Sequence, residues 1–407
     1  MPAQTTHVHT ALLSLLAIST FGCIDQLTPY ASQEGASTLE DMAQPGDLTQ
    51  RDVEGSEDDA DTDMMIREVH VALAEKTLCL LHDAQIWCRG LNAHGELGQG
   101  HVDEVEGWVQ VEPFMTWTEL EAGSSHFCAI DSRQEAWCWG SNQEGQTGHV
   151  GDPGPRRVEL AQPVRKLFAG HDSSCAITDS GRAWCWGRNS ENKLTGGDTT
   201  LPVEDPVELP LVDTVQAWST ISIGVGHLCA LDTTERMWCR GGNANMMTAP
   251  NSSMIRLREL TAVDALPPWE HVSCGSKHTC GIRAGELWCW GRVVVGQALD
   301  DSETVYPAPT RVFGPHEGFV AIESDTFHAC ALDRTGALAC WGRTIEGQLG
   351  AHPQQDEILP TWIPFDEQVW QVSLSRFATC VKTTSNVVCA GLEGDSSWTV
   401  QRLPDFL

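Results

Sequence analysis

The chain has 407 residues, and its 56 Asp and Glu against 25 Lys and Arg give a formal net charge of −31. A surface this acidic argues against nucleic acid as a partner, because Lys and Arg contacts to phosphate dominate that affinity. We interpret the charge as a device for solubility.

The first 22 residues are predicted to be an export signal. Residues 11–19 form an apolar run too short to span a membrane. It ends in Thr20-Phe21-Gly22-Cys23, which resembles a bacterial lipobox, although Thr20 replaces the usual Leu and no Lys or Arg precedes the run. We therefore expect a lipoprotein signal peptide over residues 1–22 with Cys23 lipidated, and an ordinary signal peptide is the alternative.

Residues 23–64 are predicted to be a disordered acidic tether. The stretch 24–64 carries 12 Asp and Glu and one Arg, so it accounts for −11 of the net charge and leaves −20 to the rest. With few large apolar side chains it cannot bury a core of its own. We expect it to hold the following domain away from a membrane as a flexible, self-repelling linker.

Fourteen of the 16 cysteines form seven similarly spaced pairs across residues 65–407. The members of a pair are 9 or 10 residues apart, and successive pairs begin 47 to 54 residues apart. A period of this size is typical of solenoids, propellers and arrays. The pairs are Cys79 and Cys88, Cys128 and Cys138, Cys175 and Cys185, Cys229 and Cys239, Cys280 and Cys289, Cys330 and Cys340, and Cys380 and Cys389.

Each pair flanks a predicted β-hairpin, in which two apolar runs are joined by a short polar turn; Gly181 and Gly336 suit a positive φ there. The spacing places the two cysteines opposite each other, close to disulfide reach. Trp137 and Trp139 then share one face of a strand and Cys138 lies on the other. Both faces are apolar, which favours radially packed blades. In the second repeat we expect strands at 115–122, 126–131, 135–140 and near 157–160.

Beyond the cysteines, the repeats share Gly-x-x-His-x-Cys-Ala, then Trp-Gly-x-Asn and Glu-Gly-Gln-Leu-Gly, best seen at residues 123–146 and 328–350. This pattern resembles the RCC1 repeat (regulator of chromosome condensation), whose members form seven-bladed β-propellers. The resemblance implies an all-β fold over residues 65–407. The Asn-x-x-Gly-Gln-Leu-Gly part is degenerate in repeats three, four, five and seven. The phasing predicts that each blade comes from one contiguous repeat, with no terminal strand clasping the ring.

The recurring His-x-Cys could also be read as a metal site, because His126, His227, His278 and His328 each precede a cysteine by two residues. We favour disulfides over zinc, since zinc sites usually use closer cysteine pairs and a fourth ligand. Three repeats keep both cysteines without this histidine, so we expect it to bond backbone at the strand corner. Fourteen such thiols paired as disulfides also predict a compartment outside the cytosol.

Cys274 is the one cysteine left over besides Cys23. We interpret Cys274 as a small buried free thiol near the ring centre rather than a reactive nucleophile, and the tryptophans of Cys-Trp-Gly as packing between blades. Familiar catalytic motifs are absent from the sequence, and a carboxylate pair at the ring centre is expected by chance. We therefore predict no catalytic residue, no metal and no cofactor.

The function predicted is an exported binding or scaffold protein, lipid-anchored in the bacterial cell envelope or secreted. Variable loops on a rigid scaffold usually carry specificity, and those after the third strand of each repeat vary most, at 145–157, 189–206, 243–257, 292–309 and 347–361. We expect a monomer with a protein or glycan partner, no nucleic acid and no membrane contact except the lipid. A propeller enzyme such as a glycan lyase or hydrolase is the alternative, and guanine-nucleotide exchange is a remote one that the family resemblance implies.

Overall fold

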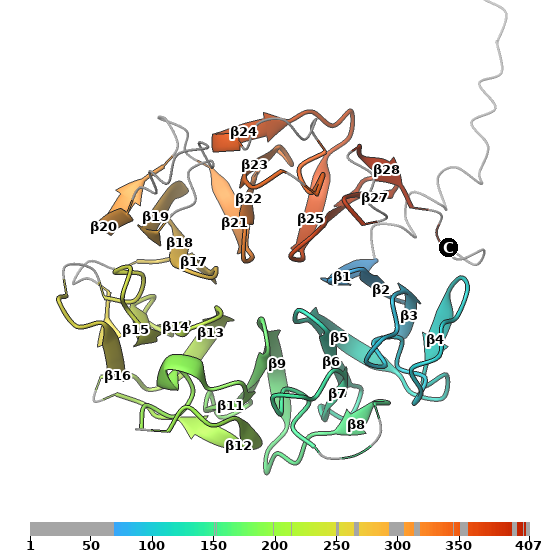
Figure 1. Cartoon of the computed structure of the whole chain (residues 1–407), viewed down its shortest axis with the longest axis horizontal. Helices are drawn as coiled ribbons and strands as arrows, with labels where there is room; N and C mark the ends of the chain where they lie inside the picture. Colours follow the sequence, from blue (N-terminus) through green and yellow to red (C-terminus); the bar gives the residue numbers. More distant parts are fainter. Residues whose placement is uncertain are drawn as a thin grey trace, which may run out of the picture. The chain divides into compact units, whose positions relative to one another are not determined.

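The computed structural model describes residues 69–149, 151, 153–197, 199–212, 214–249, 252–263, 268–292, 305–312, 318–344, 346–350, 357–392, 397–401 and 403, all within the compact unit Gly55–Leu407. These residues form seven four-stranded sheets arranged as blades around a common centre (Figure 1). The fold is the expected all-β, seven-bladed propeller. The predicted signal peptide, the tether and Cys23 lie outside the described residues.

The blades follow one another in chain order. Blade 1 comprises β1 (His70–Ala74), β2 (Thr77–His82), β3 (Gln85–Gly90) and β4 (Val109–Val111), and blade 2 comprises β5 (Trp117–Ala122), β6 (His126–Asp131), β7 (Ala136–Gly140) and β8 (Arg156–Arg157). Blade 3 comprises β9 (Val164–Ala169), β10 (Ser173–Thr178), β11 (Ala183–Gly187) and β12 (Val203–Leu209), with the short 3-10 helix η1 (Ser190–Asn192) in its last loop. Blade 4 comprises β13 (Trp218–Ile223), β14 (His227–Asp232), β15 (Met237–Gly242) and β16 (Arg256–Ala262). Blade 5 comprises β17 (His271–Cys274), β18 (His278–Arg283), β19 (Glu286–Arg292) and β20 (Val305–Arg311). Blade 6 comprises β21 (Phe319–Ser324), β22 (His328–Asp333), β23 (Leu338–Gly342) and β24 (Glu357–Ile363), and blade 7 comprises β25 (Val369–Leu374), β26 (Thr379–Thr383), β27 (Val387–Ala390) and β28 (Thr399–Val400).

Every sheet pairs its strands in sequence order, and every pairing is antiparallel. We call the strands of each blade A to D, from the channel outward (Figure 1). The A–B and C–D connections therefore emerge on one side of the ring, which we call the C–D face, and the B–C and D–A connections on the other, the B–C face. Among the described strands each blade is one contiguous repeat and none crosses to another sheet, as predicted.

The second repeat shows where the predicted strand limits fail. Strand β6 covers the expected residues, whereas β5 begins two residues later than expected and β8 contains only Arg156 and Arg157. The amide of Val158 still bonds the carbonyl of Ala136 at 2.8 Å, but the amide of Leu160 bonds the carbonyl of Val158. The chain therefore curls away from the ladder where the sequence still reads as a strand.

The B–C hairpins have the turn chemistry that the sequence suggests. Gly181 and Gly336 have φ values of +76° and +81°, a region that glycine enters without a side-chain clash. In blade 2 the Asp131 carboxylate accepts hydrogen bonds from the amides of Arg133 and Glu135, both at 2.9 Å. Asp232 and Asp333 bond their own turns in the same way. These hairpins fix the register that sets the cysteines opposite each other.

All seven cysteine pairs are joined as disulfides within their blades. In each pair the two cysteines are directly opposed on strands B and C, with Cα atoms 4.0–4.1 Å apart. This is the closer of the two kinds of antiparallel pair, the kind in which side chains approach best. All fourteen cysteines are fully buried. In blade order the bonds join Cys79 to Cys88, Cys128 to Cys138, Cys175 to Cys185, Cys229 to Cys239, Cys280 to Cys289, Cys330 to Cys340, and Cys380 to Cys389.

The core is divided among the interfaces between neighbouring blades, with one apolar cluster at each described interface. At the interface of blades 2 and 3, Cys128 and Cys138 of one blade pack with Trp186 of the next. Trp139 faces blade 1 and donates from Nε1 to the carbonyl of Glu96 at 2.9 Å. The prediction that these tryptophans pack between blades is therefore confirmed, and the disulfide faces one neighbour while the tryptophan faces the other.

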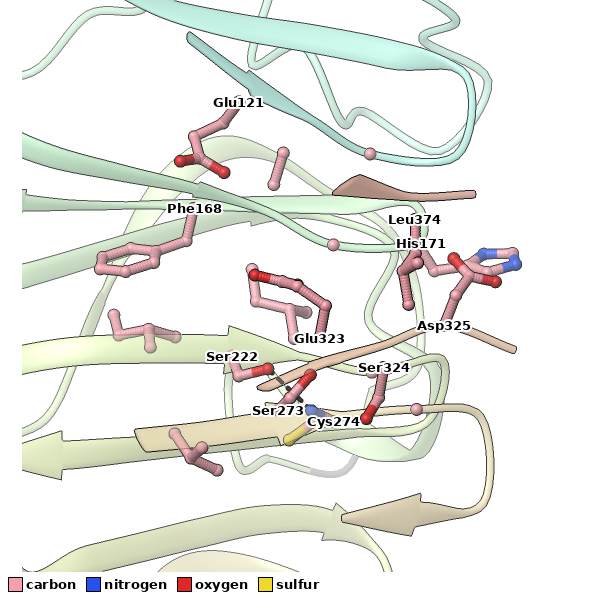
Figure 2. Close-up of a pocket in the computed structure, with 18 of the residues that line it drawn as sticks. Glu121, Phe168, His171, Ser222, Ser273, Cys274, Glu323, Ser324, Asp325 and Leu374 are labelled. Carbon is pink, nitrogen blue, oxygen red and sulfur yellow. Dashed lines mark hydrogen bonds between the residues drawn. The ribbon is translucent and has the colours of Figure 1, made fainter. Parts of the chain in front are cut away.

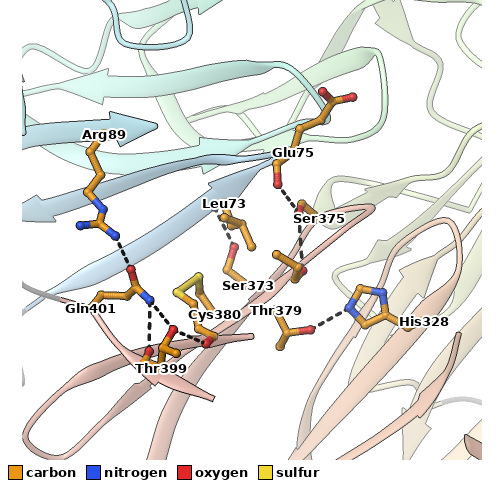
Figure 3. The surroundings of a disulfide bond; sticks show 12 residues. Leu73, Glu75, Arg89, His328, Ser373, Ser375, Thr379, Cys380, Thr399 and Gln401 are labelled. Carbon is orange, nitrogen blue, oxygen red and sulfur yellow. Dashed lines mark hydrogen bonds between the residues drawn. A yellow bond between two sulfur atoms is a disulfide. The ribbon is translucent and has the colours of Figure 1, made fainter. Parts of the chain in front are cut away.

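Side chains of β25 close the ring against blade 1 (Figure 3). Gln371 accepts from the amide of Val71 and donates to its carbonyl, both at 2.9 Å. Ser373 accepts from the amide of Leu73 at 3.0 Å, and Ser375 donates to the carbonyl of Glu75 at 2.7 Å. Two residues of β25 and Ser375 just after it thus bond the backbone of blade 1, without any shared sheet.

Candidate functional site: the central channel and the C–D face

The innermost A strands line the central channel, and neighbouring residues along each strand point toward opposite blades. Two adjoining cavities, of about 280 and 230 Å³, share Glu121 of blade 2 and Glu323 of blade 6 in their walls. The other lining residues are both polar and apolar, and the polar ones include Lys166, Ser222 and Ser273. Figure 2 shows the Glu121 and Glu323 carboxyl groups within this cavity. The channel therefore offers carboxyl, amine and hydroxyl groups beside apolar side chains.

Two of the channel carboxyl groups have raised pKa values. Enclosure within the ring, and then the charges of Glu119 and Glu323, raises the pKa of Glu121 to about 8. Enclosure and the charge of Asp325 raise the pKa of Glu323 to about 7. The side chain of Glu323 is nevertheless open to the water of the channel, and that water limits how strongly it can be perturbed. At neutral pH the channel is therefore less negative than its composition suggests.

The channel opens on the C–D face beside a charged group at the corner of blade 3. The imidazole of His171 lies 2.7 Å from the carboxylate of Asp172, and the guanidinium of Arg188 donates to the same carboxylate at 3.1 Å. Burial raises the pKa of Asp172, but the bonds from His171 and Arg188 outweigh burial and hold that pKa well below its ordinary range. Asp172 therefore stays ionised and offsets the positive charge of Arg188.

The C–D loops are pinned by the asparagine that follows the Trp-Gly or equivalent pair, even where the rest of the motif is degenerate. In blade 3, Asn189 accepts from the amide of Leu194 and donates to the carbonyl of Thr199, both at 2.9 Å. In blade 4, Asn243 accepts from the amide of Thr248 at 3.0 Å and donates to the carbonyl of Met254 at 2.9 Å. The degenerate loops described here thus keep the fold of the regular ones.

These pinned loops expose apolar side chains on the C–D face. Ile255 is 76% exposed and Leu201 is 71% exposed, on the loops of blades 4 and 3. An ion pair of 2.7 Å between Arg256 and Glu191 links the same two loops. Within the described part of the chain, the other large apolar side chains exposed on C–D connections are Leu91, Val102 and Met254. Exposed apolar side chains that gather on neighbouring loops are typical of protein-binding surfaces.

Three of the four corner histidines bond side chains of the next blade, so for these three the expectation of a backbone bond was wrong. His126, His227 and His328 place Nε2 at 2.8–2.9 Å from the hydroxyl groups of Ser174, Thr279 and Thr379. A Cβ at Gly123 would lie 2.1 Å from Cε1 of His126. The Gly-x-x-His spacing therefore makes room for an imidazole that joins blades.

One group of side chains matches the metal alternative. A ring nitrogen of His227 and the sulfur atoms of Cys229 and Cys274 lie within 4.8 Å of one another, and all three residues are buried. The sulfur of Cys229 is bonded to Cys239, so it cannot bind a metal as a thiolate. His227 and Cys274 alone fall short of the four ligands that zinc usually takes. Cys274 is the free cysteine of the described residues, and it is buried as expected.

Sequence reasoning missed two buried cations at the interface of blades 3 and 4. Lys193 occupies the position of Gln146 and Gln348 in the regular repeats, and its Nζ donates to the carbonyls of Gly224 and Val225 at 2.9 and 3.1 Å. Burial lowers the pKa of Lys193 to about 7. Arg240 replaces the tryptophan of Cys-Trp-Gly and donates to the carbonyls of Lys193 and Leu194. Alignment of the repeats shows both substitutions, but not that the side chains stay buried.

Among the described residues, no helix is long and apolar enough to cross a membrane. Of the predicted variable loops of blades 5 and 6, residues 293–304 and 351–356 lie outside the described residues.

Comparison with known proteins identifies the repeats. The model of the regulator of chromosome condensation (RCC1) repeat matches residues 117–146 and 164–192. The E3 ubiquitin-protein ligase HERC2 of Mus musculus is 24% identical over 70% of this chain and 6% of its own length. The secretion-regulating guanine nucleotide exchange factor of Mus musculus is 26% identical over 67% of this chain and 63% of its own. The chain thus spans less than two thirds of these relatives.

Solved structures show the same fold. Prp20p of Saccharomyces cerevisiae superposes with a TM-score of 0.68 at 17% identity, over 84% of this chain and 89% of that one. Human WBSCR16 superposes with a TM-score of 0.66 at 18% identity, over 75% of this chain and 84% of that one. At such identities the likeness concerns the fold alone.

Proposed function

Because the chain carries RCC1 repeats on a seven-bladed propeller, we propose that it is an exported binding module that holds a protein partner against its C–D face. The structures of RCC1-like propellers include yeast RCC1 (Prp20) with Kap60 bound, and a study of Prp20p describes its binding to Gsp1p and histones. A protein-binding scaffold is the role these relatives support. We propose that this chain binds its partner without catalysing a reaction on it.

The observation that carries the proposal is the exposed apolar pair of loops in blades 3 and 4. Leu201 and Ile255 are exposed to solvent on loops that asparagine side chains hold in place. Little conformational entropy is therefore lost when a partner covers these loops. Exposed apolar side chains on rigid loops that differ between repeats supply both affinity and specificity. The acidic charge of the chain favours a partner with a basic rim around the apolar contact.

The proposed location is the cell envelope. Fourteen cysteines buried as disulfides are stable in an oxidising compartment and would be reduced in a cytosol. We propose that Cys23 is lipidated and that residues 24–64 tether the propeller to the membrane. Metabolic labelling with a palmitate analogue tests this step. Label should enter the natural chain and not the Cys23→Ala variant, and equal labelling of the two would refute the anchor.

The partner is tested by capture with the full chain from a membrane extract of the source cell. The Ile255→Asp variant should lose the captured protein, because a buried carboxylate at the contact is unpaired. The Phe114→Asp variant is the matched control, since Phe114 is 99% exposed but lies on the D–A loop of the B–C face. Loss with Phe114→Asp and retention with Ile255→Asp would place the site on the other face. Failure of the natural chain to enrich any protein would refute the proposal.

A further inference from the structure

The free thiol of Cys274 lies beside the disulfide of the neighbouring blade. Cys274 ends β17 in blade 5, and its sulfur is within 4.8 Å of the sulfur of Cys229 on β14 of blade 4. Cys229 is bonded to Cys239 within blade 4. One thiol and one disulfide therefore share a buried space between two blades.

The fold directs Cys274 toward this disulfide. Ser273 is paired with Cys280, whose disulfide packs toward blade 6, and the adjacent Cys274 must point the opposite way. Cys274 accordingly packs in one apolar cluster with Cys229 and Cys239. Its amide donates to Oγ of Ser222 in blade 4 at 2.8 Å, which holds the strand end in place (Figure 2).

This arrangement belongs to a single interface. The residues that align with Cys274 at the ends of the other A strands are Ala74, Ala122, Ala169, Ile223, Ser324 and Leu374. Each of the other six disulfides also faces the next blade, but none of them meets a cysteine at this position. The other six interfaces are therefore internal controls for a reaction between Cys274 and Cys229.

We propose that Cys274 exchanges with the blade 4 disulfide, so that the bond Cys229–Cys239 converts into Cys229–Cys274. The Cys274 thiol gives its proton to water or hydroxide, and the thiolate attacks the sulfur of Cys229. The Cys229–Cys239 bond breaks, and Cys239 leaves as a thiolate that takes up a proton. One disulfide replaces another, so no oxidant or reductant is consumed. The product joins blades 4 and 5 covalently.

The exchange is slow in the resting ring and needs local opening. Burial raises the pKa of the Cys274 thiol to about 12, although hydrogen bonds with Ser222 and Thr279 and the charge of Lys193 act against burial. His227 and Lys193 are the titratable side chains that face this thiol. Cys274 also lines the larger channel cavity, so water and hydroxide can reach its side of the interface. The rate therefore rises with pH, because the thiolate is the attacking species.

Peptide mapping of the full chain tests the proposal. The protein is warmed at pH 9, quenched with acid, unfolded in excess N-ethylmaleimide and digested without reduction. We expect a cross-linked peptide containing Cys229 and Cys274, with N-ethylmaleimide on Cys239. Both signals should be lost in the Cys274→Ser variant. Labelling confined to Cys274 after prolonged incubation would overturn the proposal.

A pair of variants separates proximity from general scrambling. In Cys239→Ser, Cys229 and Cys274 are left as thiols, and oxidised glutathione should convert them into a disulfide by taking two electrons and two protons to give two glutathione thiols. In Cys138→Ser, Cys128 is left facing Ala169, so only a free thiol or a glutathione adduct should form. Equal outcomes in the two variants would refute a specific contact. Should either variant fail to fold, the mapping of the natural chain still decides.

Discussion

Nε2 of His126 in blade 2 lies 2.9 Å from Oγ of Ser174 in blade 3. The Ser174 hydroxyl already donates its hydrogen to the carbonyl of Gln146 at 2.9 Å, so Nε2 must be the donor. Thr279 donates in the same way to the carbonyl of Met247, so His227 is also the Nε2–H tautomer. The Nδ1 atoms of these histidines are buried and make no hydrogen bond. Protonation would therefore place an uncompensated charge between two blades.

Acid should destabilise the ring. Burial lowers the pKa of the corner histidines His126, His278 and His328 to about 4, and of His227 to about 3. Between pH 6.5 and 4 the unfolded chain binds protons that the folded chain does not, so each histidine removes up to about 1.4 kcal/mol of stability per pH unit. The raised pKa values of Glu121 and Glu323 act with the opposite sign between about pH 8 and 4.5. Four histidines outweigh two carboxyl groups, and urea unfolding from pH 7 to 4.5 should show a falling free energy of unfolding.

His126→Gln isolates one of these contributions. The glutamine amide can still donate toward Ser174 but cannot take a proton, so the slope below pH 6.5 should become shallower by up to about 1.4 kcal/mol per pH unit. His101→Gln is the control, because His101 is exposed on the C–D loop of blade 1. An unchanged slope in His126→Gln would show that the buried imidazole does not resist protonation.

Alkali should stabilise the interface of blades 3 and 4 through Lys193. Its folded pKa of about 7 lies below the ordinary 10.5, so the unfolded chain holds more protons between these values and stability rises with pH. The Lys193→Gln variant restores the residue of the regular repeats. It should reduce the rise of the unfolding free energy with pH by up to about 1.4 kcal/mol per pH unit. Urea unfolding at a series of pH values between 7 and 10 checks this difference. The Lys76→Gln variant is the control, because Lys76 is exposed.

Ring closure should depend on Gln371. In Gln371→Ala the amide and carbonyl of Val71 lose their partner, which costs about 1–3 kcal/mol of unfolding free energy. Gln368→Ala, at a nearby exposed position, should change stability by less than about 0.5 kcal/mol. Chemical denaturation of the three proteins side by side gives both differences. Equal losses would mean that apolar packing alone closes blade 7 on blade 1.

Removal of one disulfide should weaken the fold without changing its blade count. The double change Cys330→Ala and Cys340→Ala opens a loop of about ten residues, worth roughly 2.5–3 kcal/mol in the chain-entropy model and less because the hairpin is already ordered. The midpoint of urea unfolding should fall while the far-ultraviolet circular dichroism stays that of the natural chain. A loss well above about 3 kcal/mol would point to lost packing against blade 7.

The fold was largely predictable because the cysteine period reports the blade directly, and the turn residues report the hairpins. The D strands were not predictable to the residue, since a segment such as 156–160 has strand composition but leaves the ladder after Val158. A sequence pattern could also have predicted the histidine contacts. His126, His227 and His328 are each followed, one repeat later, by a hydroxyl residue just before the first cysteine. His278 is followed there by Ala329, so the pairing is a property of neighbouring repeats rather than of one.

The candidate site was less predictable than the fold. The variable C–D loops were identified from their sequences, but which of their side chains stand in water depends on where each asparagine fixes the loop. Sequence placed Cys274 near the ring centre, yet it suggested only Cys23 as a natural partner. The approach to Cys229 depends on the stacking of blades 4 and 5, which a repeat alignment does not contain.

Every disulfide in the described ring joins a cysteine to the next cysteine along the chain. The free Cys274 lies between the fourth and the fifth pair. If oxidising conditions meet the chain as it is delivered, each bond can therefore close as soon as its hairpin appears, before the following blade has arrived. An oxidase acting in order of emergence yields the native set, and an isomerase is required only after an error at blades 4 and 5. Assembly then proceeds from the first blade to the last, and the contact between blades 7 and 1 is the final event.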